Sequence, residues 1–382
     1  MSENIRFAAS QTDSLLAKIG DPHRKEPRTI NADGKVAMVG IYDWTSGFFP
    51  GNLWYIYELT GDSIWRKRAE EWTAILEPLK TFTGHHDLGF MMFCSYGNGF
   101  RLTGNEQYKE ILLETANSLA SRFSPATSCI KSWNGFKPWT DTIKCPFPVI
   151  IDNMMNLELL LWAAKTSGNN ELRDIALTHA KTTMANHLRP DFSTYHVVCY
   201  DTITGEVTNR NTHQGFADNS TWARGQAWGT YGFTMMFRET GDSAYLQTAK
   251  NLADFFINHP NLPADKVPYW DFDAGRDGFV SASQYKPETY PEQPRDASAA
   301  AVAASALFDL SIFLKDRKYF DAAETILHSL ASPAYRAQLG ANGGFLLEHC
   351  VGSIPHNSEI NVPLVYADYY FLEALGKYKK SK

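Results

Sequence analysis

The sequence contains few cysteines, and none stands at a spacing typical of a metal site or of a disulfide framework. The 382-residue chain has five cysteines and no Cys-x-x-Cys pair. They are Cys94, Cys129, Cys145, Cys199 and Cys350. Because their number is odd and their positions are far apart, we expect neither a structural metal site nor a set of disulfides.

The sequence also lacks an excess of basic residues and a long apolar segment. Its formal net charge is -6 at pH 7, which excludes the positive field that attracts nucleic acid or an anionic membrane. The N-terminus, MSENIRFAASQTDSLLAKIG, has no apolar core of an export signal, and we find no run of 18 apolar residues. We therefore expect a cytoplasmic protein, with a periplasmic location as the alternative if a signal peptide has been removed.

Nothing in the composition divides the chain into parts. Hydrophobic residues make up 44% of the sequence, enough for a substantial core, and no Pro/Ser/Gly linker or charge run interrupts it. We expect one domain over residues 1–382, present as a monomer or a weak homodimer.

What the sequence has instead is a repeated turn between two helical segments. The copies are Thr60-Gly61-Asp62, Thr103-Gly104-Asn105, Ser167-Gly168-Asn169, Thr240-Gly241-Asp242 and a degenerate Leu314-Lys315-Asp316. Glycine can adopt the left-handed conformation that closes a helix, and the Asp or Asn after it can accept backbone N–H bonds that open the next one. The pattern therefore predicts a series of helical hairpins.

The first helix of each hairpin is the more apolar one, and a polar residue stands about one helix length before its turn. These residues are Asp43, Asp87, Asp152, Arg224 and Asp296, and a sixth helix of this kind follows Asn361. Six such helices of about 25 Å can close into a ring with the polar residues on one rim. We therefore predict an all-α fold, an (α/α)6 barrel, over the alternative of an open α-solenoid, whose inner helices need no common acidic rim.

Two aspartates on this rim are candidates for catalysis. A carboxylate at the start of a helix is often only a cap. Asp152, however, follows the apolar run Pro146 to Ile151, which would desolvate it and favour the protonated form that a general acid requires. Asp87 follows His85 and His86, which as neighbours on a helix point about 100° apart and cannot chelate one ion. From spacing alone, Asp87 and Asp152 are as consistent with catalysis as with capping, and we expect no metal.

The connection from Asp191 to Thr221 is the only long irregular stretch that the helical pattern leaves, and long loops in compact domains are usually functional. It contains a predicted hairpin around Asp201 and ends in Ser220-Thr-Trp-Ala-Arg-Gly-Gln-Ala-Trp-Gly229. Arg224 suits a substrate carboxylate at a helix N-terminus, with an ion pair to a rim aspartate as an equal alternative. The tryptophans at the rim, Trp44, Trp222 and Trp228, suit sugar stacking, although core packing explains tryptophan as well.

Several segments together resemble the unsaturated glucuronyl hydrolases of glycoside hydrolase family 88. The segments are Asp43-Trp-Thr-Ser-Gly-Phe, His85-His-Asp-Leu-Gly-Phe, Ile151-Asp-Asn-Met-Met-Asn-Leu, Thr212-His-Gln-Gly and the segment from Ser220 to Gly229, with Tyr366-Ala-Asp-Tyr-Tyr-Phe-Leu-Glu-Ala-Leu375 extending the match. They follow that family's order from about residue 40 onward. The resemblance implies an (α/α)6 barrel that acts on oligosaccharides ending in a 4-deoxy-hex-4-enuronic acid, the products of polysaccharide lyases, without metal or organic cofactor.

The resemblance also implies roles for individual residues. Asp152 matches the acid that protonates C4 and helps water add at C5, after which the sugar linkage breaks down, so the usual carboxylate pair attacking the anomeric carbon does not apply. Asp87 matches a second essential aspartate that holds the sugar hydroxyls. His196, Gln214 and Arg224 match residues around the uronate, and Trp44, Trp222 and Trp228 match stacking or pocket-wall positions.

One departure bears on the substrate. Streptococcal members that favour sulfated substrates carry a Ser-x-Ser-x-Lys stretch, whereas this chain has Val351-Gly-Ser-Ile-Pro-His-Asn-Ser-Glu-Ile360, which leaves open another mode of sulfate recognition that uses, for example, His349, Ser353 or His356. The parent polysaccharide, a glycosaminoglycan or another, is not readable from the sequence. The alternatives are an unsaturated rhamnogalacturonyl hydrolase acting on pectin fragments, and a catalytically silent carbohydrate-binding protein.

Overall fold

Each predicted Gly-Asx turn ends one helix and begins the next. Gly61, Gly104, Gly168 and Gly241 all adopt the left-handed conformation, with φ between 66° and 76°. The Asp or Asn after each glycine accepts a hydrogen bond from the backbone N–H two residues later. In the degenerate fifth turn Lys315 takes the left-handed conformation, and Asp316 caps the next helix in the same way. The five hairpins are therefore confirmed.

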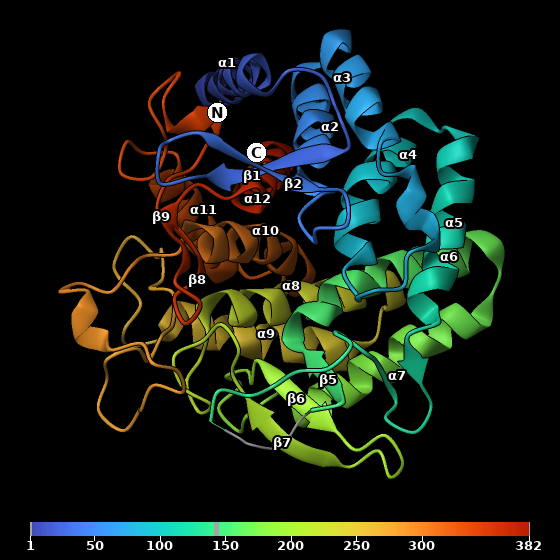
Figure 1. Ribbon diagram of the computed structural model, residues 1–382, viewed down its shortest axis with the longest axis vertical. Coiled ribbons are helices and arrows are strands. Elements are labelled where there is room, and N and C mark those ends of the chain that lie inside the picture. Colours follow the sequence, from blue (N-terminus) through green and yellow to red (C-terminus); the bar gives the residue numbers. More distant parts are fainter. Residues whose placement is uncertain (1, 141–144, 382) are drawn as a thin grey trace.

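The computed structural model describes residues 2–140 and 145–381, and its helices form two concentric rings (Figure 1). The inner helices are α2 (Phe48–Thr60), α4 (Asn98–Thr103), α6 (Leu157–Ser167), α8 (Ala223–Thr240), α10 (Ala297–Leu314) and α12 (Val365–Ser381). The outer helices are α1 (Ser2–Ile19), α3 (Ser63–Ala74), α5 (Glu106–Ala120), α7 (Asn170–Asn186), α9 (Ser243–Asn258) and α11 (Arg317–Leu330). Because α12 packs against both α10 and α2, the inner ring closes. The all-α (α/α)6 barrel is confirmed, and the open solenoid is excluded.

Three inner helices begin later than the sequence pattern predicts. Asp43 lies in a turn before α2, where its carboxylate accepts hydrogen bonds from the backbone N–H and the hydroxyl of Thr45. A π-helix, η2 (Gly89–Gly97), leads into α4, and a 3-10 helix, η3 (Ile151–Asn156), leads into α6. Asp87 therefore lies just before an irregular helical turn and Asp152 lies within one, which a 3.6-residue periodicity cannot reveal.

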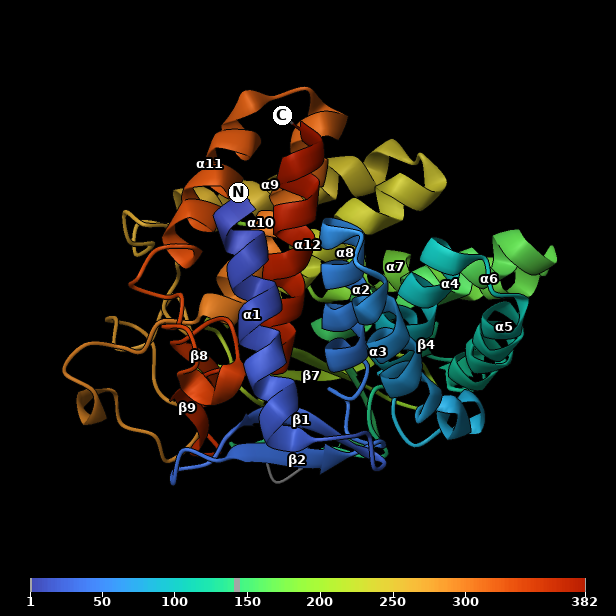
Figure 2. The ribbon, with the colours of Figure 1, turned by 90° about the horizontal axis from the view of Figure 1, so that it is seen from above.

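Short strands and loops gather at the end of the barrel where the inner helices begin (Figure 2). They form four small antiparallel sheets, with shorter 3-10 turns η1 (Glu77–Thr81), η4 (Pro287–Thr289) and η5 (Asn342–Gly344) between helices. The strands are β1 (Lys25–Ile30), β2 (Val36–Gly40), β3 (Phe123–Ser124), β4 (Cys129–Ile130), β5 (Phe147–Ile150), β6 (Val197–Tyr200), β7 (Val207–Asn211), β8 (Cys350–Ser353) and β9 (Ser358–Val362). The predicted hairpin around Asp201 is β6–β7.

The expectation that residues 191–221 are the only long irregular stretch is wrong. The connections between α9 and α10 and between α11 and α12 are also long, and they contain only short 3-10 turns or a two-stranded sheet. All three connections lie at the end of the barrel where the inner helices begin.

We expected no set of disulfides, and the structure contains a single one that the sequence did not reveal. Cys145 and Cys199 form a disulfide, although they are 54 residues apart in the sequence. They meet because β5 pairs with β6, which places Pro148 opposite Cys199. The other three cysteines are free and buried. Pairing of distant strands brought the two residues together, and cysteine spacing alone carries no sign of it.

One inner helix is strongly apolar. Helix α10 is, among the described residues, the one helix long and apolar enough by length and composition to cross a membrane, although its serines and Asp309 leave it without a continuous run of 18 apolar residues. Most of its residues are buried inside the protein, where it contacts α8, α11 and α12. A helix that is apolar on all sides is expected here, because an inner-ring helix is covered by neighbours on every side.

Candidate active site

A pocket at the N-terminal ends of the inner helices brings the predicted residues together. Its lining residues are Trp44, Asp87, Trp133, Ile150, Asp152, Gln214, Trp222 and Arg224. We call this space the acid pocket. Of the predicted site residues, His196 and Trp228 do not line it but lie behind it, next to Asp152. Sequence reasoning missed Trp133, which lies in no recognised motif, and Ile150, which had been noted only as part of an apolar run.

The segment that carries Asp152 is seated against a glycine face of α8. Gly225, Gly229 and Gly232 are spaced four and three residues apart, so they lie on one side of the helix. A Cβ atom at Gly232 would lie 2.4 Å from the Cβ of Met154, and one at Gly229 would lie 3.4 Å from Ile151. Glycine is therefore required at Gly232 for η3 to approach this closely, and the approach determines where Asp152 lies.

Asp152 is a buried carboxyl group with an unsatisfied oxygen. The residue is 8% exposed, and its Oδ2 has no hydrogen-bond partner. Burial raises the pKa of Asp152 to about 7; the charge of Asp87 adds to the rise, whereas Arg224 opposes it. Near neutral pH a substantial fraction of this group therefore holds its proton, as a general acid must.

Asp87 is equally buried but lies between two imidazole rings. His85 Nδ1 lies 3.1 Å from Asp87 Oδ2, and His86 Nε2 lies 3.3 Å from Asp87 Oδ1. Burial acts to raise the pKa of Asp87, but the imidazoles of His86 and His85 outweigh it and hold this pKa below its ordinary value. Asp87 is therefore ionised where Asp152 is protonated.

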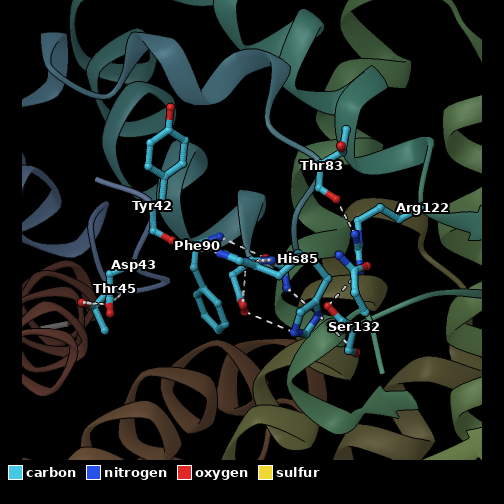
Figure 3. Close-up of polar contacts among 12 residues, drawn as sticks. Tyr42, Asp43, Thr45, Thr83, His85, Phe90, Arg122 and Ser132 are labelled. Atoms are coloured by element: carbon cyan, nitrogen blue, oxygen red, sulfur yellow. Dashed lines mark hydrogen bonds and ion pairs between the residues drawn. The ribbon is translucent and has the colours of Figure 1, made fainter. Parts of the chain in front are cut away.

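The surroundings of His85 hold this part of the rim in place (Figure 3). His85 Nε2 lies 3.1 Å from the carbonyl oxygen of Tyr42, in the turn before α2. Nearby, Arg122 donates hydrogen bonds to the carbonyl oxygens of Thr83 and Ser132 on either side of the His85–Asp87 segment. The two histidines thus orient a carboxylate, and the part of the chain that the structure describes contains no group of three His, Cys, Asp or Glu arranged to hold a metal ion.

His196 is held in one tautomer that directs a proton toward Asp152. Its Nδ1 accepts hydrogen bonds from the backbone N–H groups of His213 and Gln214, both 3.2 Å away. Burial lowers the pKa of His196 well below its usual range, so the ring is neutral and carries its proton on Nε2. This Nε2 lies 3.9 Å from Asp152 Oδ2 and has no hydrogen-bond partner.

Arg224 forms the ion pair that the sequence left as one of two alternatives. Its guanidinium lies 2.9 Å from the carboxylate of Asp296 and donates to the carbonyl oxygens of Val351 and Gly352. The Nε–H of Arg224 nevertheless has no partner, and the same is true of the indole N–H of Trp228. Together with Asp152 Oδ2 and His196 Nε2, these are buried polar groups without partners around one pocket, which is the arrangement expected where a polar ligand binds.

The loop that carries Gln214 is fixed by two aspartates. Asp271 accepts hydrogen bonds from the backbone N–H of Phe216 and from the hydroxyl of Ser220, and Asp218 accepts one from the N–H of Thr212. Gln214 then donates its side-chain amide to the carbonyl oxygen of Gly352. The loop is therefore fixed at both ends before any ligand binds.

Outside the acid pocket, aromatic and imidazole rings continue its wall. The indole N–H of Trp139 donates to the carbonyl oxygen of His213, and the His356 ring lies 4.9 Å from Trp139 and 4.4 Å from the ring of His213. Ser353 contacts Nδ1 of His356 at 2.6 Å. Of the three residues considered for sulfate, Ser353 and His356 lie on this wall, whereas His349 contacts Asn361 instead.

Comparison with known proteins agrees with this geometry. The family model described as Glycosyl Hydrolase Family 88 matches residues 23–378. The chain is 48% identical over 353 residues to an unsaturated glucuronyl hydrolase from Formosa agariphila, covering 92% of this chain and 84% of that protein. It is 31% identical to an unsaturated chondroitin disaccharide hydrolase from Streptococcus pyogenes, covering 93% and 86%.

The solved structures agree with the fold as well. A crystal structure of an unsaturated glucuronyl hydrolase specific for heparin superimposes with a TM-score of 0.91 at 46% identity, covering 99% of this chain and 96% of that one. A variant of the Streptococcus agalactiae unsaturated glucuronyl hydrolase, solved in complex with dGlcA-GalNAc6S, superimposes with a TM-score of 0.80 at 28% identity, covering 100% and 92%.

Proposed function

Because the chain belongs to Glycosyl Hydrolase Family 88, we propose that it is an unsaturated glucuronyl hydrolase. It releases the terminal 4-deoxy-hex-4-enuronic acid from oligosaccharides that a polysaccharide lyase has produced. The observation that carries the proposal is the pair of carboxyl groups in the acid pocket, whose pKa values are pushed in opposite directions. Such a pair separates the roles of acid and charged stabiliser.

Asp152 gives its proton to C4 of the unsaturated ring, and the electron-rich C4=C5 bond supplies the electrons for the new C–H bond. Water adds its oxygen to C5, and the proton that it loses returns to Asp152, so the enzyme is regenerated. The C5 hemiketal then opens to a ketone, which leaves a hemiacetal at C1 that breaks down to release the next sugar. One carboxyl group serving first as acid and then as base is sufficient for this sequence.

The neighbouring residues have distinct tasks in this scheme. Asp87 stays ionised, binds sugar hydroxyls and stabilises the positive charge that develops at C5. The unpartnered Nε–H of Arg224 and the helix N-termini at this end of the barrel attract the uronate carboxylate. His196 directs its Nε2 proton to an oxygen of the substrate or of the water.

The remaining predicted residues shape the pocket. Trp44 and Trp222 form its walls, and the indole N–H of Trp228 faces Asp152. Gln214 contributes its side-chain amide near the uronate. The rings of Trp139, His213 and His356 extend the wall toward the leaving sugar.

A spectroscopic assay tests this function. The conjugated enoate absorbs in the near ultraviolet, and hydration removes that absorbance. Unsaturated disaccharides from glycosaminoglycans should lose it on incubation with the protein, whereas those from rhamnogalacturonan should not. Decay with the pectin fragments alone would favour the rhamnogalacturonyl hydrolase, and decay with neither would favour a carbohydrate-binding protein. The relatives, named for glucuronyl and chondroitin substrates, support the first outcome.

Two properties of the molecule complete the proposal. The protein acts as a monomer or weak homodimer, and its net charge of -6 supports a function without nucleic acid or an anionic membrane. The Cys145–Cys199 disulfide supports the periplasmic over the cytoplasmic location, because disulfides persist in oxidising compartments. Light scattering of the purified protein tests the first property. Fractionation of cells that express the natural gene tests the second, and recovery in the cytoplasm would reject it.

A further inference from the structure

The two segments that carry the acidic residues meet at one buried side chain, that of Asn156. This residue ends η3, four positions after Asp152, and it is completely buried. Its Oδ1 accepts a hydrogen bond of 3.1 Å from the backbone N–H of Phe90, three positions after Asp87. Its Nδ2 lies 3.4 Å from Nδ1 of His86. One amide group therefore connects the Asp152 segment to the Asp87 segment at both of its ends.

The contact with Phe90 fixes which way the amide of Asn156 faces. Because a backbone N–H can only donate, the atom that receives it must be the oxygen, and the NH2 group must then face His86. Nδ1 of His86 also faces the hydroxyl of Ser132 at 3.5 Å, and it accepts from these donors. The proton of the neutral His86 ring is therefore on Nε2, 3.3 Å from Asp87 Oδ1.

The backbones of the two segments also touch at this point. A Cβ atom at Gly89 would lie 2.5 Å from the Cα of Asn156 and 2.7 Å from its Oδ1. Since one of these neighbours is a backbone atom, no rotation of a side chain could make room. The separation between the Asp87 and Asp152 segments is therefore set by a backbone contact that leaves no room for a side chain.

We propose that Asn156 is a positioning residue for the hydration reaction. It holds His86 in the tautomer whose Nε2 proton faces Asp87, and it sets the distance between Asp87 and Asp152. The inference rests on the proposed function, because it needs these two carboxyl groups to act together. Three ionisable groups face Asp152, namely Asp87, Arg224 and His196. Of these, Asp87 is the one that Asn156 holds in place.

The variant Asn156→Leu removes both hydrogen bonds at nearly constant side-chain size. We expect kcat to fall about 10- to 100-fold, the scale of a small misplacement of a catalytic group. Because the charge of Asp87 contributes to the raised pKa of Asp152, a displaced Asp87 also lowers that pKa. The alkaline limb of kcat/KM should therefore move to lower pH, which a loss of stability alone would not cause.

The matched control is Asn98→Leu at the other end of the barrel. Asn98 is also buried and donates to the carbonyl oxygen of Cys94 and to Tyr369, but it is remote from the acid pocket. The control should keep the alkaline limb of the wild type, whatever its stability. If the limb of Asn156→Leu also matches the wild type, Asn156 is not a positioning residue.

A second variant keeps the test decisive if Asn156→Leu does not fold. Asn156→Asp retains an acceptor for Phe90 but faces His86 with an acceptor, so the imidazole must turn its proton away from Asp87 or become charged. We expect a shifted alkaline limb for this variant too, and an unchanged limb would overturn the inference. Wild-type protein assayed in parallel separates the two proposals, since absence of wild-type turnover would reject the proposed function and not the role of Asn156.

Discussion

The two ends of the barrel each contain a buried carboxyl group, and the two groups behave in opposite ways. At the N-terminal ends of the inner helices, Asp152 has an oxygen without a partner, and burial raises its pKa to about 7. At the C-terminal ends, Glu373 accepts hydrogen bonds from Tyr55, Tyr231 and Ser305. Burial acts to raise the pKa of Glu373, but the nearby Lys377 and these donors lower it. Burial acts to raise the pKa of both carboxyl groups, and at Glu373 the charge of Lys377, together with the hydroxyl donors, reverses the rise.

The larger of the two cavities is bounded by residues none of which, in the part of the chain that the structure describes, has a buried side-chain atom without a hydrogen-bond partner. A cavity of about 530 Å³ opens at the C-terminal ends of the inner helices, bounded by Glu58, Arg101, Glu158, Arg238 and Lys377 among others. Its charged side chains form ion pairs with one another, such as Arg101 with Glu58. The acid pocket is smaller, yet polar atoms without partners surround it. Unsatisfied hydrogen-bonding groups therefore identify the active end better than cavity size does.

Replacing each of these two carboxylic acids by its amide should give the largest difference in turnover between the two ends of the barrel. Asp152→Asn removes the transferable proton, so we expect turnover to fall about a thousandfold or more with the fold and substrate binding preserved. Glu373→Gln removes an equally buried carboxyl group but should leave kcat within about threefold of the wild type, since general acid catalysis does not involve it. Initial rates from enoate absorbance, with circular dichroism as the check on folding, measure both. An Asp152→Asn enzyme within tenfold of the wild type would remove Asp152 from the role of acid.

The same two substitutions should have the opposite order of effect on the free energy of unfolding. Glu373→Gln leaves Lys377 and the hydroxyl donors with a neutral partner, so we expect the free energy of unfolding to fall by about 2–3 kcal/mol, the scale of hydrogen bonds to a charged group. Asp152→Asn should cost much less at pH 7, because Asp152 has no such partners. Urea denaturation of the two variants measures the difference. Equal losses at both sites would show that the donors around Glu373 do not stabilise its charge.

The pH dependence of kcat/KM tests the protonation state of Asp152 at the active end of the barrel. Because Asp152 must be protonated to act, kcat/KM should be high below its pKa of about 7 and fall about tenfold per pH unit above it. The rate is therefore retained on the mildly acidic side and lost as the carboxyl group ionises. Initial rates between pH 5 and 9 test this. A rate that rises steadily into the alkaline range contradicts the assignment of Asp152 as the acid.

Local chemistry in the sequence predicted the hairpins, because a left-handed glycine and a capping Asx residue act within a few positions of each other. Residues brought together by packing between distant segments were harder to foresee. The Cys145–Cys199 disulfide depends on the pairing of β5 with β6, and the ion pair of Arg224 with Asp296 depends on which inner helices are neighbours.

The candidate site divides in the same way. Its aspartates lie before or within the irregular turns that lead into the inner helices, and the turn spacing places them on one rim, so the rim could be predicted. The π-helix after Asp87, the glycine face of α8 and the presence of Trp133 in the pocket depend on how closely particular backbones approach. None of these has a local sequence signal. The resemblance to a known family supplied the roles that spacing could not.

The smallest effect concerns the turns at the C-terminal ends of the inner helices. Lys315 adopts φ 52° in the fifth turn, where the other four have glycine. Lys315→Gly relieves about 1–2 kcal/mol of left-handed strain but increases the entropy of the unfolded chain by about 0.5–1 kcal/mol, so we expect a net stabilisation of about 0.5–1 kcal/mol.

The reciprocal Gly241→Lys is the matched control, since a side chain there has open space and differs only in strain. It should destabilise by a similar amount, as measured by urea denaturation, and neither variant should change kcat, because both turns lie at the end of the barrel away from Asp152. A change in kcat for either would mean that the two ends are coupled and that the contrast between them is incomplete.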